Sequence, residues 1–140
     1  MCNIIFTFFA LLLLTDIKNV ILAANAIERI AFLSFVNSDQ SPSLFDDQYF
    51  QKLVELVEVH MSKLSVSDLS RYIRGMASLR VADQNIYRQI TSEFSSRVST
   101  ESPSELATII WTCGCILDKG GPISKSLVYS AALKLSDALT

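Results

Sequence analysis

The sequence predicts an all-α fold, namely an α-solenoid of about three stacked helix–turn–helix repeats with a period of 37 residues. Half of the residues are hydrophobic and only four are glycine, a composition that suits packed helices. Few segments alternate between polar and apolar residues, so no strand is expected. The segment of residues 65–79 (SVSDLSRYIRGMASL) is matched in residue type, 37 positions later, by residues 102–116 (SPSELATIIWTCGCI).

The first repeat is predicted over residues 15–64. Its opening helix, residues 15–27 (TDIKNVILAANAI), aligns with residues 67–79 at an offset of 52. Five of its residues then fall on the apolar columns: Ile17, Val20, Ile21, Ala24 and Ile27. The longer offset fits an insertion within residues 34–44 (SFVNSDQSPSL), a polar stretch containing Pro42 that is typical of a loop. Residues 46–64 are predicted to form the second helix, and four of its residues match the next repeat at the same offset: Asp46, Tyr49, Phe50 and Leu53 with Asp83, Ile86, Tyr87 and Ile90.

The second and third repeats are predicted over residues 65–101 and 102–140. Both begin Ser-x-x-acid, the capping box in which the serine accepts a hydrogen bond from the first turn and the acid reaches back. Pro103 occupies the first helical position, where a missing N–H costs nothing. The second helices are expected at residues 83–98 and 123–139. Their apolar residues match at the same offset: Ile86, Ile90 and Phe94 with Ile123, Leu127 and Ala131.

Such a unit repeats for a physical reason. A single pair of short helices cannot bury its apolar stripe, whereas stacked pairs share a continuous core. A chain of 140 residues suits one domain of this kind. Solenoids usually end in repeats with polar outer faces, but both ends here are apolar. We therefore expect a fragment of a longer array, or a shortened gene product.

Residues 1–14 form a separate apolar N-terminal segment with two interpretations. Residues 4–14 (IIFTFFALLLL) are either the remnant of a preceding helix or the hydrophobic part of a signal peptide. In the second case an A-x-A pattern at residues 24–26 would be the cleavage site, and the protein would be secreted. No lysine or arginine precedes the run, and Asp16 and Lys18 follow it, which favours the helix. The run is too short to span a bilayer, so a membrane protein is not expected.

Enzyme chemistry is not expected either. The one histidine, His60, lies in a helical pattern that favours a structural or surface imidazole over a general base. Cys113 and Cys115 are two positions apart on a helix, so their side chains diverge and cannot chelate a metal together. The chain has three cysteines, which make no disulfide framework. The sequence thus predicts no catalytic residues, no metal and no cofactor.

The segment ELATIIWTCGCI, residues 105–116, resembles the opening helix of the octotricopeptide and heptatricopeptide repeats of organellar RNA-binding proteins. Those arrays often adjoin a RAP domain and are related to FAST-kinase-like proteins. The resemblance covers about residues 15–139 and is best in the third repeat, while the second has Arg74 where the tryptophan would stand; no RAP domain is recognised. It implies a mitochondrial protein that binds single-stranded organellar RNA in RNA processing, stability or ribosome assembly. Its neighbours would be ribonucleoprotein partners or further repeats of a longer chain.

Candidate RNA-binding residues follow from stacking the opening helices. The alignment sets Asn19, Arg71 and Thr108 in one row, and Leu22, Arg74 and Trp111 in the next; Arg88 lies on the following helix. Changing side chains on a constant scaffold are how helical-repeat proteins read successive bases. Exposed arginines are also explained by solvation, and a tryptophan by packing between helices.

The net charge of the chain does not decide between two classes of function, RNA binding and protein binding. The net charge of −2 lacks the basic excess that phosphate binding favours. It is unevenly distributed, since residues 38–59 carry −4 and residues 60–100 carry +3. The alternative is a protein–protein interaction solenoid without RNA contact, favoured by the near-neutral charge and the apolar ends.

Overall fold

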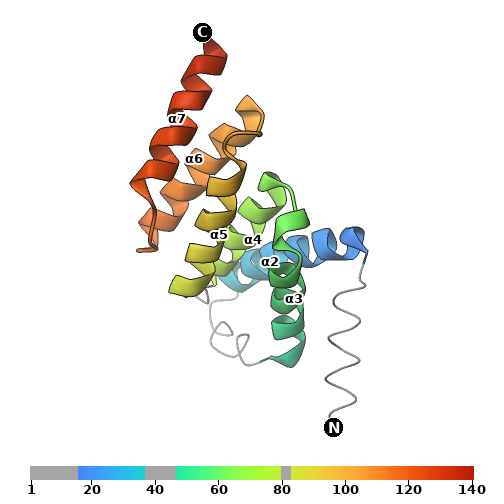
Figure 1. Cartoon of the computed structure of the whole chain (residues 1–140). Coiled ribbons are helices and arrows are strands. Elements are labelled where there is room, and N and C mark those ends of the chain that lie inside the picture. The colour runs from blue at the N-terminus through green and yellow to red at the C-terminus, as the bar shows by residue number, and fades with distance from the viewer. Residues whose placement is uncertain (1–15, 37–46, 80–82) are drawn as a thin grey trace.

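The computed structural model describes residues 16–36, 47–79 and 83–140 (Figure 1). Within these ranges the chain forms six α-helices and one 3₁₀ turn, with no β-strand. The all-α prediction is therefore confirmed. The apolar segment 1–14 and the predicted loop from residue 37 onward lie outside the described residues.

Three of the helices contact one another in series, and the other three pack beside them. Helices α2, α4 and α6 correspond to the predicted opening helices and contact one another in that order. Helix α3 packs on α2, α5 contacts α4, α6 and α7, and α7 packs along α6. Figure 1 shows α6 and α7 side by side at the end of the molecule away from α2 and α3. The bounds are α2 Ile17–Val36, α3 Gln48–Val59, η2 Met61–Lys63, α4 Val66–Ser78, α5 Gln84–Arg97, α6 Pro103–Asp118 and α7 Lys125–Leu139.

Two predicted helix ends are wrong. Helix α2 continues to Val36, so residues 34–36 are helical and not part of the loop. No glycine or proline interrupts residues 28–36, and buried Ala31 extends the stripe of Ile27. Helix α3 ends at Val59, earlier than predicted, because His60 leaves the helical region with φ −109° and ψ 19°. The next residues tighten into η2, where the Leu64 N–H donates to the Met61 carbonyl at 3.2 Å.

The predicted serine caps are present on both later opening helices. The Ser65 hydroxyl accepts from the Asp68 N–H at 3.1 Å and donates to the Asp68 carboxylate at 2.9 Å. At α6 the Ser102 hydroxyl accepts from the Glu105 N–H at 3.3 Å, and Pro103 lies in the first turn. Each cap satisfies an N–H that the helix itself leaves unpaired.

Aspartates cap two of the second helices. Asp83 accepts from the Ile86 N–H at 2.8 Å, as expected for the start of α5. On α3 the cap is Asp47, whose carboxylate accepts from the Tyr49 and Phe50 N–H groups at 2.7 and 3.2 Å. Asp46, which the sequence matched with Asp83, lies outside the described residues, and Asp47 is the residue at the capping position. Tyr49 is exposed where its aligned partner Ile86 is buried.

The core is built from residues at equivalent positions of the three opening helices. Three aligned columns are buried in all of them: Val20, Tyr72 and Ile109; Ala24, Met76 and Cys113; Ile27, Leu79 and Ile116. The second helices contribute Ile90 and Phe94 of α5, and Leu127 and Ala131 of α7, which are also 37 residues apart. Burial of these columns is the main favourable term in the stability of the fold.

The opening helices are joined by two contacts of different kinds. At Gly75 of α4, an added Cβ would lie 3.1 Å from the Glu28 Cα, so α2 crosses α4 at close range. Between α4 and α6, the hydroxyls of Ser70 and Thr112 are 2.6 Å apart in a buried position. Thr112 donates its own proton to the Thr108 carbonyl at 2.7 Å, so Ser70 is the donor to Thr112.

Basic side chains on α5 and α7 bind the turns that precede the neighbouring opening helices. The Arg97 guanidinium donates to the carbonyls of Leu64 and of Met61, the latter at 3.0 Å, and pairs with Glu93 at 2.7 Å. The Lys134 ammonium, 37 residues later, donates to the Ser99 carbonyl. The helix pairs are therefore tied through backbone carbonyls as well as through the apolar core.

Candidate nucleic-acid interface

Arg74 lies at the centre of the surface formed by the opening helices. Its guanidinium is 3.4 Å from the Glu28 carboxylate of α2, and its Nε donates to the Ser70 carbonyl at 3.3 Å. The guanidinium carbon lies 4.7 Å from the centre of the Trp111 ring of α6, a cation–π contact. The side chain is still 37% exposed. Arg74 thus bridges three helices and keeps a face open to solvent.

Arg71 projects from the same helix, one turn earlier. Its guanidinium is 4.0 Å from the Asp68 carboxylate and donates to the Asn25 side chain of α2 at 3.3 Å. Its side chain is 46% exposed. The sequence alignment set Asn19 in this row, but the structure brings Asn25 here and leaves Asn19 exposed nearer the start of α2. The shift has a physical cause, because α2 crosses α4 tightly at Gly75 and does not follow the register of the later repeats.

The α6 part of the surface consists of Trp111 and Thr108. Trp111 is 53% exposed although one face of its ring meets Arg74. Thr108 is half-buried, and its hydroxyl donates to the Ser104 carbonyl at 3.1 Å, which leaves its oxygen as an acceptor. The row partner expected for Arg74 on α2 was Leu22. This side chain is exposed, and Glu28 makes the contact in its place.

A hollow of about 430 Å³ adjoins Arg74 on the α2 side. Its lining combines the Arg74 guanidinium, the exposed ring of Phe32 and the Glu28 carboxylate, completed by Ala31, Gly75 and Ser78. An aromatic ring and a guanidinium plane are the two groups on which nucleobases stack. Phe32 was missed from the sequence because it lies beyond the predicted end of the first helix. Apolar residues continue at helical spacing past Ile27, and this signal could have extended the predicted helix to Phe32.

Arg88 is not brought to this surface. It lies on α5, beside a separate hollow of about 420 Å³ that is also lined by Glu58, Met61, Gln89, Ser92 and Glu93. Burial raises the pKa of Glu58 above its ordinary value, and the neighbouring carboxylates of Asp83 and Glu55 raise it further. The surroundings of Arg88 are therefore acidic, and unfavourable to a polyanion.

Other reactive groups lie inside the fold. Cys113 is buried, and burial raises the pKa of its thiol to about 11, so it is a poor nucleophile at neutral pH. His60 is buried at the end of α3. The residues that the structure describes contain no group of three or more histidines, cysteines, aspartates and glutamates that could hold a metal ion. None of the described helices has the length and apolar character needed to cross a membrane.

The surface therefore consists of two arginines, a half-exposed tryptophan and an exposed phenylalanine on three contacting helices. It can offer positive charge to phosphate groups and flat faces to bases. Comparison with known proteins adds no family to this geometry: no protein-family model matches the chain, and neither a curated protein nor a solved structure matches it.

Proposed function

We propose that the protein is a helical-repeat solenoid with a period of 37 residues, built from repeats at about residues 15–64, 65–101 and 102–140. Three buried columns recur across α2, α4 and α6 at the aligned offsets, which supports this repeat. Arg97 and Lys134 also stand 37 residues apart, and each donates to the backbone of the turn that precedes the neighbouring opening helix. Helices α2, α4 and α6 would then be successive opening helices of one array.

We further propose that this array binds single-stranded RNA in mitochondria, in RNA processing, stability or ribosome assembly. One observation carries the proposal, namely the Arg74 guanidinium stacked on the half-exposed Trp111, with Arg71 one turn away. The resemblance of residues 105–116 to organellar RNA-binding repeats supports the same function and is the reason for placing it in mitochondria. Phe32 extends the stacking surface across the hollow beside Arg74.

On binding, phosphate groups of the RNA would replace the carboxylates that pair with Arg71 and Arg74. Arg71 and Arg74 face Asp68 and Glu28 across partly exposed pairs, and such pairs contribute only about 0–1 kcal/mol. A phosphate group can therefore replace the carboxylate on either guanidinium at little cost. Bases on both sides of that phosphate would stack on Trp111 and Phe32, where each stacked base contributes about 1–3 kcal/mol.

The test is a titration of single-stranded RNA against the double variant Arg71→Glu/Arg74→Glu over a series of salt concentrations. Affinity should fall by more than about tenfold, and the slope of log K against log salt should shrink by about 1.4 for two lost phosphate contacts. The matched control is Arg88→Glu, which reverses a charge outside the surface and should leave the affinity almost unchanged. Equal losses in both variants would show nonspecific attraction, and no loss in either would refute RNA binding by this surface.

The Glu28→Gln variant tests the exchange of ion pairs from the opposite direction. Because Glu28 holds Arg74 at 3.4 Å, its neutralisation should strengthen RNA binding while the fold is retained. Fractionation of cells, with detection of the protein in the mitochondrial matrix, tests the location separately. Weaker binding by Glu28→Gln would contradict competition between Glu28 and phosphate for Arg74.

A protein-interaction solenoid without RNA contact is the second candidate. It is favoured by the large apolar side chains exposed on α6 and α7, which are Trp111, Leu117, Tyr129, Leu133 and Leu139. Ultraviolet crosslinking in cells discriminates the two candidates, since RNA should be recovered covalently bound to the protein only in the first case.

A further inference from the structure

Helix α6 presents an exposed face on the side away from α4. Thr112 contacts α4 through Ser70, and Gly114 lies two residues further on, about 200° around the helix axis. Ala107 and Leu117 are exposed on this side with Gly114, and Ile110 between them is only half-buried. We call Ala107, Ile110, Gly114 and Leu117 the open face of α6.

The open face has a covered counterpart inside the molecule. Ser70, Ile73 and Ala77 of α4 stand 37 residues before Ala107, Ile110 and Gly114, and all three are buried. Ser70 is covered by α6 itself, through Thr112. Among the described residues, the side of α4 that receives the next opening helix is buried, whereas the equivalent side of α6 is exposed at Ala107 and Gly114.

The chemistry of the open face suits packing against another helix. Its two small residues, Ala107 and Gly114, allow a second backbone to approach closely. A Cβ added at Gly114 would meet no atom within 4 Å, so the space above it is empty. None of the four residues carries a charge, so a second copy of the same face would bring no like charges together.

We propose that the open face of α6 binds the same face of a second copy of this chain, with the two α6 helices antiparallel about a two-fold axis. Helix α6 spans Pro103–Asp118, so the axis of a centred pair passes between Ile110 and Trp111. This register sets Ala107 of each copy opposite Gly114 of the other, small residue against small residue. Ile110 of each copy then lies beside Trp111 of the other, and an aromatic side chain at the centre is typical of strong interfaces.

Charge complementarity supports this occupant. The antiparallel register places Asp118, the last residue of α6, beside Pro103 at the start of the other α6. Pro103 has no N–H and Ser102 already accepts from the Glu105 N–H, so the helix dipole is what stabilises a carboxylate at this end. The contact occurs twice because of the symmetry.

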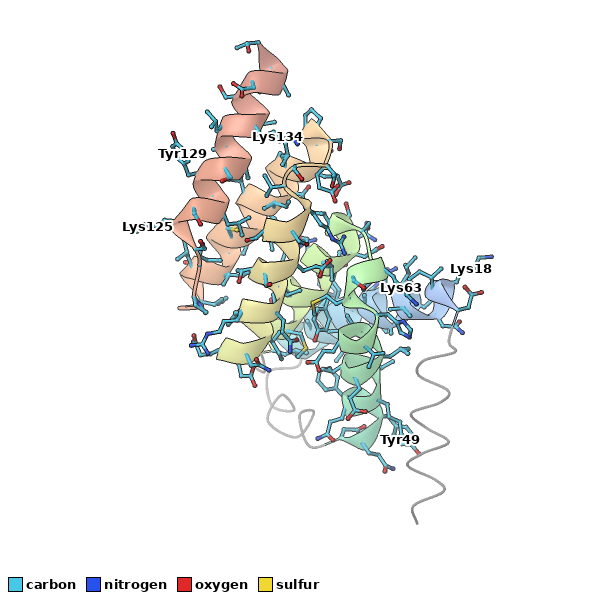
Figure 2. All side chains as sticks on the ribbon, in the orientation of Figure 1. Lys18, Tyr49, Lys63, Lys125, Tyr129 and Lys134 are labelled. Atoms are coloured by element: carbon cyan, nitrogen blue, oxygen red, sulfur yellow. The ribbon has the colours of Figure 1, made fainter. Side chains whose placement is uncertain are left out.

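Helix α7 can extend the same interface. Figure 1 places α7 beside α6 at the end of the molecule, and Figure 2 shows Tyr129 projecting from α7 away from the other helices. Tyr129 and Leu133, one turn apart on α7, are both exposed. Trp111 belongs to both proposed surfaces, but Ala107 and Gly114 lie outside the RNA surface, so substitutions there test the dimer separately.

The test is sedimentation equilibrium of the 140-residue chain and its variants over a wide range of protein concentrations. The wild type should form a dimer, and Gly114→Lys and Ala107→Glu should each lose it, because each places two unpaired charges in the contact, one from each copy. The double variant Ala107→Glu/Gly114→Lys should regain the dimer, since the introduced carboxylate of each copy then faces the introduced ammonium of the other. The matched control, Ser92→Lys on the exposed side of α5, should remain dimeric.

Circular dichroism shows whether each variant is folded. The fluorescence of Trp111 provides a second measurement of dimer formation, which needs no substitution. Trp111 is the only tryptophan in the chain, so all tryptophan emission comes from this one position beside the open face. Quenching by acrylamide should fall as the wild-type concentration rises. A monomeric wild type, a dimer that survives both single substitutions, or a double variant that stays monomeric would each overturn the proposal. Survival of the dimer would assign it to another surface, including the apolar residues 4–14.

Discussion

Two glycines lie inside helices of this protein, and their surroundings are opposite. Gly75 marks the crossing of α2 and α4, where an added Cβ would lie 3.1 Å from the Cα and 3.2 Å from the N of Glu28. Gly114 faces open space on α6. Glycine is required for packing at the first position and costs helix stability at the second.

This difference gives a matched pair of substitutions. Gly75→Val should lower the free energy of unfolding by about 1–3 kcal/mol, because the side chain must push α2 from α4. Gly114→Ala should raise it by up to about 1 kcal/mol, because the added methyl group meets nothing and the helix gains propensity. Urea unfolding followed by circular dichroism at low protein concentration measures both. Similar changes for the two variants would contradict the close crossing at Gly75.

Glu58 is a second residue whose surroundings predict a measurable effect. Its pKa is raised in the folded state by burial, then by Asp83 and Glu55, so the folded protein binds its proton more tightly than the unfolded chain. The stability that this proton contributes is present below the ordinary glutamate pKa and is lost as pH rises through the folded pKa. At neutral pH the ionised carboxylate is therefore destabilising.

Glu58→Gln should consequently raise the unfolding midpoint in urea at pH 7. The advantage over the wild type should disappear as the pH is lowered below the ordinary range of glutamate, where Glu58 is protonated in both states. Unfolding curves at several pH values measure this. A constant difference at all pH values would mean that the side-chain amide acts through packing or hydrogen bonds and that charge is not the cause.

At the level of the elements, α5 is bound to its neighbours through Arg97 as well as through Ile90 and Phe94. The Arg97 fork reaches the carbonyls of Met61 and Leu64, on both sides of Lys63 in the turn between α3 and α4. The Met61 carbonyl also accepts from the Leu64 N–H, while the Leu64 carbonyl follows the end of η2, where backbone acceptors lack helical partners. The guanidinium therefore joins α5 to η2 and to the residue that follows η2, and Glu93 holds it in position at 2.7 Å.

Replacement of Arg97 should loosen this junction. Arg97→Met should lower the free energy of unfolding by about 2 kcal/mol, since charge-assisted hydrogen bonds to carbonyls are lost. Arg97→Lys should recover part of the loss, because a single ammonium cannot reproduce the fork. The matched control is Arg88→Met on the same helix. Thermal unfolding measures all three variants, and an equal effect at Arg88 would show that net charge, and not the junction, is responsible.

In the molecule as a whole, prediction succeeded where contacts are local and failed where they join distant segments. The caps at Ser65 and Ser102 depend on a few neighbouring residues, so the sequence contains the full information. The end of α2 and the Phe32 ring were missed because the alignment to shorter repeats stopped the helix too early.

Only part of the candidate site was predicted from the sequence, because only some of its contacts follow from the repeat spacing. Arg74 and Trp111 lie on helices of matched length and offset, so their neighbourhood could be inferred from the spacing. Glu28 and Asn25 could not, because α2 crosses α4 at a position set by Gly75 and not by the repeat register. Arg88 was grouped with the other arginines by charge alone, and its helix carries it to a different, acidic surface.

The sequence by itself determined the helical class, the apolar columns and most helix starts, because periodicity and capping act within a few turns. Tertiary structure alone decided how α2 crosses α4, which acids face the arginines and which side of α6 stays open. These features depend on the distance between backbones, as at Gly75 and Gly114. The sequence does not show that a neighbouring helix packs against Gly75 and that none packs against Gly114 among the described residues.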